Sequence, residues 1–434
     1  MTNTPIAAGD IKWGSVQESH LFEKVGEGHY RLEIPEAAAV FDVDRLWRDR
    51  HELCGEVAIA CNLKGARTFN GKVFSGHINL SDSYRRRDVC TRLKAKANTG
   101  SQVDWEGLID ELAARIVSAE REGRPAKLLD TYERPAPDEI FNLEGIVLPK
   151  RHPSMIFGDG GSFKSYLALY VAGWLGQQGV RVLFLDWELE GEDHRDRLER
   201  LFGASMPPVY YQRMYRPMVS EIDGIKRQVE ELGIQYVVCD SVGFATDGAP
   251  ENAEAAMGYF RSVRQLGVGS VHLAHVTKPK EDAADPTKPF GSVFWHNSAR
   301  STWFVKRTES IDERRFVVAL FNRKANLGPV RPAVGLQIEF GDERTTLQRV
   351  DLADVDELAS NLPIWQRMKR ALQCGPMTLV ALADEMGATD DTRDKLVATM
   401  DREARRKKGV FVKLTDTPDR IHRIALVSNR TEVA

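Results

Sequence analysis

The residues best suited to chemistry lie in a glycine-rich stretch near the middle of the chain. Residues 157–165 read Phe-Gly-Asp-Gly-Gly-Ser-Phe-Lys-Ser, and they follow an apolar pair, Met155 and Ile156. Glycines let successive backbone N–H groups curve around an anion, and a helix that begins there adds the positive end of its dipole. Lys164 can then reach terminal phosphates, and the Ser165 hydroxyl can hold Mg²⁺. This order of apolar run, glycine turn and Lys-Ser predicts a phosphate-binding loop between a strand and a helix.

One position departs from the common GxxxxGK(S/T) pattern, because Phe163 stands where glycine is usual. The phenyl ring crowds the loop, and a ring that blocked phosphate entry would leave a scaffold without nucleotide. A glycine-rich hairpin with an accidental Lys-Ser is a further alternative. In the nucleotide-binding interpretation, the contacts come from Gly158, Asp159, Gly160, Gly161, Ser162, Phe163, Lys164, Ser165 and Tyr166.

A group of acids follows the continuous apolar run 182–185. Such a run is typical of a strand buried on both faces of a parallel sheet, and the carboxyl ends of these strands line the ligand crevice. Glu188 is therefore placed to orient and deprotonate a water that attacks a γ-phosphate. The alternative is a solvated acidic loop made of Asp186, Glu188, Glu190, Glu192 and Asp193. We assign catalysis to Glu188 and solvent exposure to the later acids.

A second strand-like run, residues 234–241, carries Asp240 near its end. Apolar residues that end in one Asp form the Walker B pattern, in which the carboxylate holds Mg²⁺ beside the loop serine. We therefore expect Asp240 and Ser165 to share a metal ion.

A third strand-like run, residues 270–278, places His275 and Lys278 at its far end. His275 is a candidate sensor that hydrogen-bonds the γ-phosphate, and a purely structural histidine is the alternative. We expect His272 to pack internally.

These side chains need a sheet and its helices to bring them together. The residue pattern predicts helices over 164–178, before Gly179, and over 221–232. Strands that alternate with helices form a parallel sheet covered on both faces. The sequence therefore predicts an α/β fold with a mostly parallel sheet.

Length and composition limit the class of protein. The 434 residues suggest about three domains. A formal net charge of −3 excludes a polycation that coats nucleic acid, so such binding would need local basic surfaces. Five cysteines without CxxC spacing argue against zinc and disulfides. No apolar run reaches the roughly 18 residues of a membrane span, so we expect a cytoplasmic protein without a membrane partner.

Residues 1–135 are predicted to form a small α+β domain after a loosely held lead-in of about 30 residues. Helices are expected from Ser81 and from near Asp104, and the first of them carries a basic cluster over residues 85–96. That cluster could contact phosphates, although solvated charge is the alternative. The β-like runs are 30–34, 56–60 and 72–75, and residues 135–138 resemble a linker.

Residues 361–430 form the last predicted domain. Helices are expected over 364–373, 378–386 and 392–408, followed by a hairpin of strands 410–414 and 421–427. Three helices and a hairpin resemble a winged helix. Residues 361–434 hold 14 Lys or Arg against 10 Asp or Glu, among them Arg402, Arg405, Arg406, Lys407 and Lys408. This local basic charge favours DNA contact, and a protein-docking module is the alternative.

The predicted central domain, residues 140–350, resembles the RecA-like ATPases, in particular the RepA-type hexameric helicases and related AAA-labelled ATPases of phages and plasmids. The resemblance rests on residues 158–165, 183–188 and 237–241 and on the strand that holds His275. A base-like carboxylate at the end of the second strand is a RecA-type trait, whereas AAA+ proteins keep that Glu directly after the Walker B Asp, where Ser241 stands here. The resemblance implies a RecA-like P-loop NTPase core that uses ATP and Mg²⁺ through Lys164, Ser165, Glu188 and Asp240, in a homo-oligomeric ring, expected to be a hexamer.

Rings of this type take a cationic residue from the neighbouring subunit to stabilise charge on the transferring phosphate. Residues 290–300 and 305–307 resemble the segment after the sensor strand in the RepA-type group. Residues 322–329 resemble a Lys, Arg, Gly, Pro stretch of DnaB-type helicases, with Asn326 at the position of the finger arginine. The ranked candidates are Lys324, Arg307 and Arg300, and structural ion pairing is the alternative for each.

The loops after the Asp and His strands correspond to those that hold single-stranded DNA in the pore of RecA-like rings. The first loop, residues 243–252, has no Lys or Arg, and its Phe244 would either stack on a base or be buried. Phosphate contacts would then come from the second loop, through Lys278, Lys280 and Lys288.

Two functions follow from these expectations. The preferred one is a Mg²⁺-dependent ATPase that translocates on or unwinds DNA in the replication of a mobile element, with single-stranded DNA in the pore and duplex DNA at the winged helix. The alternative is a DNA-binding regulator or helicase loader that uses ATP as an assembly switch and does not unwind.

Overall fold

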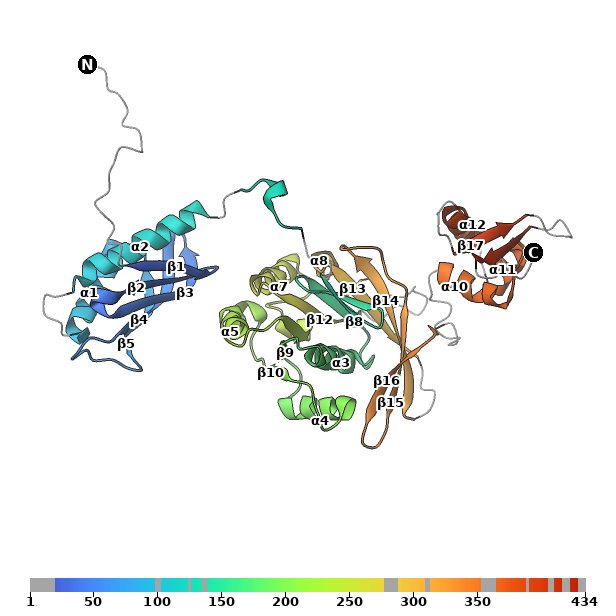
Figure 1. Ribbon diagram of the computed structural model, residues 1–434, viewed down its shortest axis with the longest axis horizontal. Coiled ribbons are helices and arrows are strands. Elements are labelled where there is room, and N and C mark those ends of the chain that lie inside the picture. Colours follow the sequence, from blue (N-terminus) through green and yellow to red (C-terminus); the bar gives the residue numbers. More distant parts are fainter. Residues whose placement is uncertain are drawn as a thin grey trace, which may run out of the picture. The chain divides into compact units, whose positions relative to one another are not determined.

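The computed structural model describes residues 20–97, 103–123, 126–134, 139–276, 288–308, 313–352, 364–387, 390–404, 410–415 and 422–427. The chain divides into two compact units, Met1–Arg134 and Pro135–Ala434 (Figure 1). We call them the N-terminal unit and the second unit. The linker expected at 135–138 lies outside the described residues.

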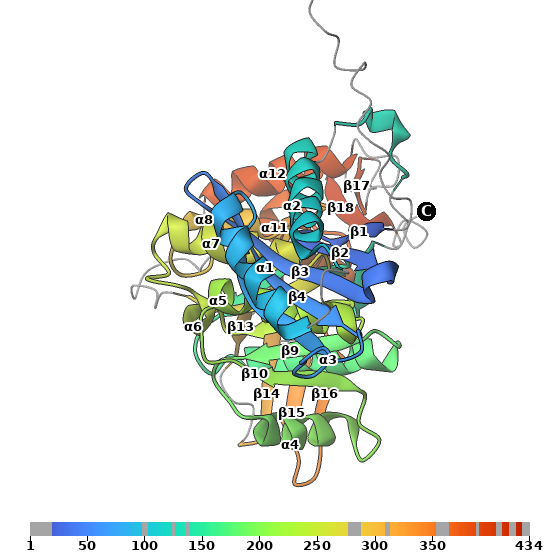
Figure 2. The same cartoon turned by 90° about the vertical axis from the view of Figure 1, so that its left-hand side faces the viewer.

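The N-terminal unit is an antiparallel sheet with two helices on one of its faces (Figures 1 and 2). Its strands pair in chain order: β1 (Leu21–Gly26), β2 (His29–Ile34), β3 (Ala39–Asp49), β4 (Glu52–Cys61) and β5 (Lys72–Asn79). Helices α1 (Ser83–Ala97) and α2 (Trp105–Glu122) bury Leu93, Trp105 and Ile109 against the sheet. Asp104 caps α2 as expected, because its side chain accepts a hydrogen bond from the Gly107 N–H at 3.1 Å.

The expected lead-in of 30 residues is wrong in its second half. Residues 21–26 form β1, which pairs with β2 and lays the Phe22 ring on Tyr30 with the ring centroids 5.6 Å apart. Strand β3 was also not expected. Its first residues alternate between buried apolar and outward positions, as Phe41 and Asp42 show, but a register shift between Val43 and Arg45 ends this alternation.

In the part of the second unit that the structure describes, nine strands form one sheet in the order β10-β9-β11-β12-β8-β13-β14-β15-β16. The first five neighbouring pairs are parallel and the last three are antiparallel, so the expected α/β fold with a mostly parallel sheet is confirmed. The strands are β8 (Pro153–Gly158), β9 (Val182–Asp186), β10 (Val209–Arg213), β11 (Tyr236–Asp240), β12 (Gly269–His275), β13 (Ser301–Arg307), β14 (Arg315–Ala325), β15 (Val334–Phe340) and β16 (Thr345–Val350). A hairpin of β6 (Ile140–Leu143) and β7 (Ile146–Pro149) precedes them.

Helices cover both faces of this sheet (Figure 1). On one face, α3 (Lys164–Gln177) and α4 (Gly191–Phe202) bury residues such as Leu175 and Leu198. On the other face, residues such as Ile225 and Phe260 belong to a second apolar core. The helices there are α5 (Met218–Glu231), α6 (Val242–Ala245), α7 (Ala253–Gln265) and α8 (Val293–Ser298). Central strands that are buried on both faces explain the continuous apolar runs in the sequence.

The end of the chain forms a small cluster of its own. Helices α10 (Ile364–Ala371), α11 (Leu379–Glu385) and α12 (Asp390–Ala404) surround a core with Met368, Leu382 and Leu396, and β17 (Phe411–Leu414) pairs with β18 (Arg423–Leu426). The basic residues 405–408 and the hairpin turn 416–419 lie outside the described residues.

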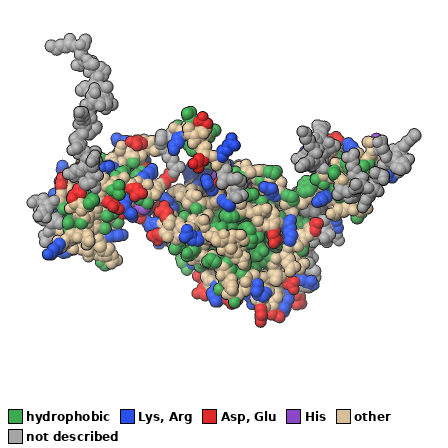
Figure 3. All heavy atoms as spheres, viewed as in Figure 1, with side chains coloured by type: hydrophobic (Ala, Val, Ile, Leu, Met, Phe, Trp, Pro, Cys, Tyr) green, Lys and Arg blue, Asp and Glu red, His purple; other side chains and the backbone are tan. Residues whose placement is uncertain are grey.

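Acidic and basic side chains are mixed over the face seen in Figure 3, in keeping with the small net charge. Among the helices that the structure describes, none is both long and apolar enough to cross a membrane.

Candidate nucleotide-binding site

The glycine-rich loop joins the end of β8 to the start of α3. Gly158 cannot carry a side chain, because a Cβ there would lie 2.5 Å from the Val305 carbonyl oxygen of β13. Gly161 has a φ of +72°, which glycine adopts without strain. The Ser162 hydroxyl donates to the Asp159 carbonyl at 2.8 Å and closes the turn. The loop is thus a tight, concave backbone turn in front of a helix N-terminus, as an anion site requires.

Lys164 is the first residue of α3, and its side chain is only 6% exposed. Its ammonium donates to the carbonyl oxygens of Asp159 at 2.7 Å and Gly158 at 3.0 Å. Burial lowers the pKa of Lys164, and the negative charges of Asp240, Asp159 and Glu188 oppose that shift. The positive charge therefore lies at the loop and faces the acids at the ends of β9 and β11.

Asp240 ends β11 and is 3% exposed. Burial raises the pKa of Asp240 to about 7; a hydrogen bond from Ser165 opposes that rise, and the nearby Asp186 and Glu188 add to it. A hydroxyl beside a buried carboxylate is the oxygen donor set that Mg²⁺ prefers when phosphates supply its other ligands. The residues therefore fit a magnesium ion held between Ser165 and Asp240.

Glu188 lies two residues beyond the end of β9, and its carboxylate accepts a hydrogen bond from the Ser241 hydroxyl at 2.6 Å. Ser241 directly follows Asp240, so Glu188 lies beside the residue that follows the metal-binding candidate. The later acids Glu192 and Asp193 are exposed, as expected. Asp186 is not, because it is fully buried at the end of its strand.

His275 ends β12 and pairs in register with Gly158, so the neighbouring strand carries it to the loop. Burial lowers the pKa of His275, and the Lys164 charge lowers it further. His272 packs internally as expected, with hydrogen bonds to the Tyr259 hydroxyl at 2.7 Å and the Ser270 hydroxyl at 2.8 Å. The structure thus brings together Lys164, Ser165, Glu188, Asp240 and His275 at the carboxyl ends of adjacent strands.

The Phe163 ring lies away from the backbone turn of the loop. Its backbone is left-handed, with a φ of +62°, as glycine would be at this position. The ring packs against Phe316 of β14 and Phe340 of β15, with the centroids 5.1 and 5.3 Å apart. The expectation that Phe163 crowds the loop is therefore corrected, because an aromatic cluster on the antiparallel strands holds its ring. Tyr166 joins the same cluster through Phe340.

Arg307 lies at the phosphate loop of its own chain. It ends β13, donates to the Gly161 carbonyl at 3.0 Å, and places its guanidinium 5.3 Å from the centroid of the Phe163 ring. Within this one chain, Arg307 therefore contacts its own phosphate loop, and a contact with the site of a neighbouring subunit stays a prediction.

Lys324 and Arg300 lie at the opposite edge of the sheet. Ser301 and Ala325, their neighbours in sequence, pair with each other. Ser301 also pairs with Ser154 near the start of β8, whereas the phosphate loop follows the end of β8. Lys324 donates to the carbonyls of His296, Asn297 and Ala299 at the end of α8, at 2.8 to 2.9 Å. These contacts favour the structural alternative for Lys324, and its role in a neighbour's site stays a prediction. Arg300 has an exposed side chain and is the candidate that we carry forward.

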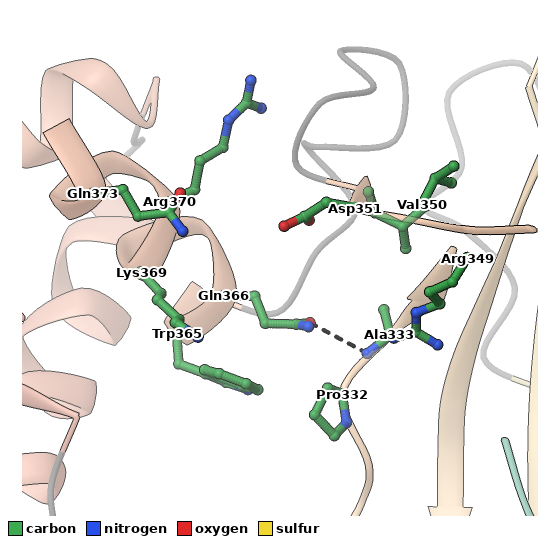
Figure 4. Close-up of a pocket in the computed structure, with 11 residues that line it drawn as sticks. Pro332, Ala333, Arg349, Val350, Asp351, Trp365, Gln366, Lys369, Arg370 and Gln373 are labelled. Atoms are coloured by element: carbon green, nitrogen blue, oxygen red, sulfur yellow. Dashed lines mark hydrogen bonds between the residues drawn. The ribbon is translucent and has the colours of Figure 1, made fainter. Parts of the chain in front are cut away.

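A cavity of about 450 Å³ lies elsewhere, between the start of β15, the end of β16 and helix α10 (Figure 4). Trp365, Gln366 and Lys369 line one side of it, and the Gln366 side chain accepts a hydrogen bond from the Ala333 N–H at 3.4 Å. None of the loop residues lines this cavity, so it is separate from the candidate site.

Comparison with known proteins gives one family match. Residues 118–281, less than half of the chain, match the family described as AAA domain, and they include the loop, Glu188, Asp240 and His275. The central part of the chain is therefore similar to an AAA-type ATPase domain. No curated protein matches the chain.

Two solved structures are similar to part of the chain. One is an ATPase domain with 15% sequence identity and a TM-score of 0.36, over 44% of this chain and 82% of that chain. The other is the KaiC-like protein PH0186 from Pyrococcus horikoshii OT3, with 13% identity and a TM-score of 0.36, over 46% of this chain and 91% of that chain. The chemical assignment of the site comes from its own residues and distances.

Asp240→Asn is expected to stabilise the protein in magnesium-free buffer. The folded-state pKa of Asp240, about 7, lies above its ordinary value of 3.8, so the buried carboxylate costs stability progressively as pH rises between these values. The cost grows by about 1.4 kcal/mol per pH unit in that window, and Asn removes it. Chemical denaturation at about pH 5 and about pH 8 should show a larger gain for Asp240→Asn at the higher pH. Exposed Glu343→Gln serves as the control, and an equal gain at both pH values contradicts the burial of this charge.

Phe163→Ala is expected to destabilise the protein more than Phe163→Gly. Both changes remove the ring from Phe316 and Phe340, but only glycine adopts the left-handed backbone freely, a difference of about 1 kcal/mol. Denaturant unfolding of the two variants measures this difference. A gain of more than about tenfold in ATP affinity for Phe163→Gly would mean that the ring obstructs the loop after all.

Proposed function

We propose that this chain is a Mg²⁺-dependent ATPase that assembles into a homo-oligomeric ring and translocates on or unwinds DNA. The observation that carries the ATPase part is the convergence of Lys164, Ser165, Asp240 and Glu188 at one edge of the sheet. The family match over residues 118–281 supports the same assignment.

In this proposal each residue has a distinct task in hydrolysis. The loop amides and Lys164 bind the phosphates of ATP, and Ser165 and Asp240 hold the magnesium ion. Magnesium, when bound, neutralises charge that develops on the phosphate oxygens. Glu188 orients the attacking water and accepts its proton, and the Ser241 hydroxyl keeps the carboxylate in place.

His275 and a neighbouring subunit complete the site in this proposal. His275 hydrogen-bonds the γ-phosphate and reports its loss to the loop that follows β12. The ends of that loop are joined, because the Phe290 N–H donates to the His275 carbonyl at 2.9 Å. Arg300 of the neighbouring subunit supplies the transition-state cation.

The DNA part of the proposal rests on the loops beyond β11 and β12, which are neighbouring strands. Phe244 follows β11 and is 64% exposed, and this exposure supports base stacking over burial. Lys288 is exposed, whereas Lys278 and Lys280 lie outside the described residues. Duplex DNA at the winged helix is a further part of the proposal, with α12 as the element that enters the groove.

Lys164→Ala and Glu188→Gln are each expected to abolish ATP turnover, because the first removes the phosphate cation and the second removes the base. Steady-state hydrolysis by the full chain, with and without single-stranded DNA, measures both. We expect DNA to stimulate the unchanged chain and a labelled forked duplex to be separated in an ATP-dependent manner. Undiminished turnover in both variants would refute the site.

Phe244→Ala tests the DNA contact in the same assays. Loss of one base stack is expected to weaken DNA binding by about 1 to 3 kcal/mol and to reduce the stimulation. Phe69→Ala is the matched control, because Phe69 is an exposed phenylalanine of the N-terminal unit.

DNA-stimulated hydrolysis by the unchanged chain without any strand separation or movement would favour the alternative function, a regulator or loader that uses ATP as a switch.

A further inference from the structure

The turn that carries Glu188 is held by one buried carboxylate. Asp186 is the last residue of β9 and has no exposed surface. Its Oδ1 accepts hydrogen bonds from the backbone N–H groups of Glu188 at 2.6 Å and Leu189 at 3.2 Å. The backbone direction at Glu188 therefore depends on where the Asp186 carboxylate points.

In the described part of the chain, the other oxygen of Asp186 forms a hydrogen bond with one side chain. Oδ2 meets Nε2 of His194, a residue of α4 that is 3% exposed. The imidazole lies against the rings of Phe184 and Tyr211, with centroid distances of 4.8 and 5.5 Å. Within the described residues, the second ring nitrogen of His194 has no hydrogen-bond partner. The contact to Asp186 is thus the polar interaction that the buried imidazole makes.

Neighbouring strands hold the remainder of the turn. The Tyr211 hydroxyl donates to the Leu189 carbonyl at 2.6 Å, and Arg213 donates to the Asp186 carbonyl and to the Glu190 carboxylate, both at 3.0 Å. The Trp187 N–H donates to the Asp240 carbonyl at 2.7 Å. Among the residues that the structure describes, however, only the Asp186 side chain contacts the backbone N–H of Glu188 itself.

Charge makes this arrangement specific. Asp186 pairs in register with Asp240 across β9 and β11, and Glu188 lies beside Ser241, so three carboxylates share one edge of the sheet. A buried carboxylate without a donor is costly, and the removal of one partner from such a pair is strongly destabilising. His194 supplies that donor from the side of the sheet opposite to α5 and α7.

We propose that Asp186 and His194 are positioning residues, in which His194 fixes the Asp186 carboxylate and Asp186 fixes Glu188 toward the phosphate loop. The inference rests on the proposed ATPase function, because it assigns the pair to the placement of the base. Neither residue touches the substrate. A misplacement of about 1 Å at a reacting group can lower the rate roughly a hundredfold, so the pair should act on kcat. The KM for ATP should change little, since the loop residues that bind phosphates are elsewhere.

Two substitutions at His194 separate positioning from packing. His194→Gln keeps an N–H donor near the place of Nε2 but loses the ring, whereas His194→Phe keeps a ring against Phe184 and Tyr211 but loses the donor. Steady-state ATP hydrolysis by the full chain should show kcat reduced roughly 10- to 100-fold in His194→Phe, with the KM within about threefold of the unchanged chain. His194→Gln should recover most of kcat. A faster His194→Phe than His194→Gln would overturn the proposal, because ring packing would then be the role of His194.

A second pair of variants covers a loss of folding in His194→Phe, which leaves Oδ2 of the buried Asp186 carboxylate without its donor. Asp186→Asn combined with His194→Phe removes that charge and keeps an oxygen acceptor for the Glu188 N–H, whereas Asp186→Ala combined with His194→Phe keeps neither. The first double variant should turn over at least about tenfold faster than the second. Equal rates in the two would contradict the positioning role.

Glu188→Gln is measured in parallel, so that two failures can be told apart. Full turnover by Glu188→Gln removes the base role that the proposed function gives to Glu188, and the inference with it; full turnover by Lys164→Ala as well removes the proposed function. An inactive Glu188→Gln together with a fully active His194→Phe removes the inference alone.

Discussion

The site depends on the balance between one buried ammonium and the carboxylates that face it. Lys164 is held at the end of β8 and the start of α3, with its charge directed to Asp159, Glu188 and Asp240. Burial disfavours the charged form of both Lys164 and Asp240, and the negative charge of Asp240 opposes the shift in the pKa of Lys164. Such groups are costly in a folded core and are found where function needs them.

The sheet order produces this balance from residues far apart in sequence. Strand β8 lies between β12 and β13, and β11 lies between β9 and β12. Parallel register then brings His275 beside Gly158 and Asp186 beside Asp240. The antiparallel strands support the loop itself. Phe316 of β14 and Phe340 of β15 pack against the Phe163 ring. The loop can therefore hold Phe163 in place of the usual glycine, because the ring packs on these strands and not inside the turn.

Much of the central site could be predicted from local sequence. The glycine turn, the apolar strands and the acids at their ends are features of a few neighbouring residues, and the structure has them where the patterns place them. The N-terminal caps of α2 and α11 also involve residues close in sequence. In α11, the Thr378 side chain accepts a hydrogen bond from the Ala381 N–H at 3.1 Å.

The rest depended on contacts over long sequence distances. The Phe163 ring packs on strands that lie about 150 or more residues away in sequence. Arg307 reaches the loop because its strand, β13, pairs with β8. The local pattern around Lys324 predicts a finger, but its contacts with the carbonyls at the end of α8 depend on residues about 25 positions away. In the sequence, Asp186 is only one of an acidic group, and His194 belongs to no motif; the packing of α4 on β9 brings the two together. The N-terminal strands β1 and β3 lack a sustained alternation, because β1 is mostly exposed and β3 has a register shift between Val43 and Arg45.

The most direct test is a crystal structure of the chain with Mg²⁺ and a non-hydrolysable ATP analogue. The account predicts that the phosphates lie against the backbone of residues 158–165, with Ser165 and Asp240 at the metal ion and the Glu188 carboxylate facing the terminal phosphate. Phosphates bound outside this turn, or Glu188 and Asp240 directed away from them on opposite sides of the sheet, would contradict it.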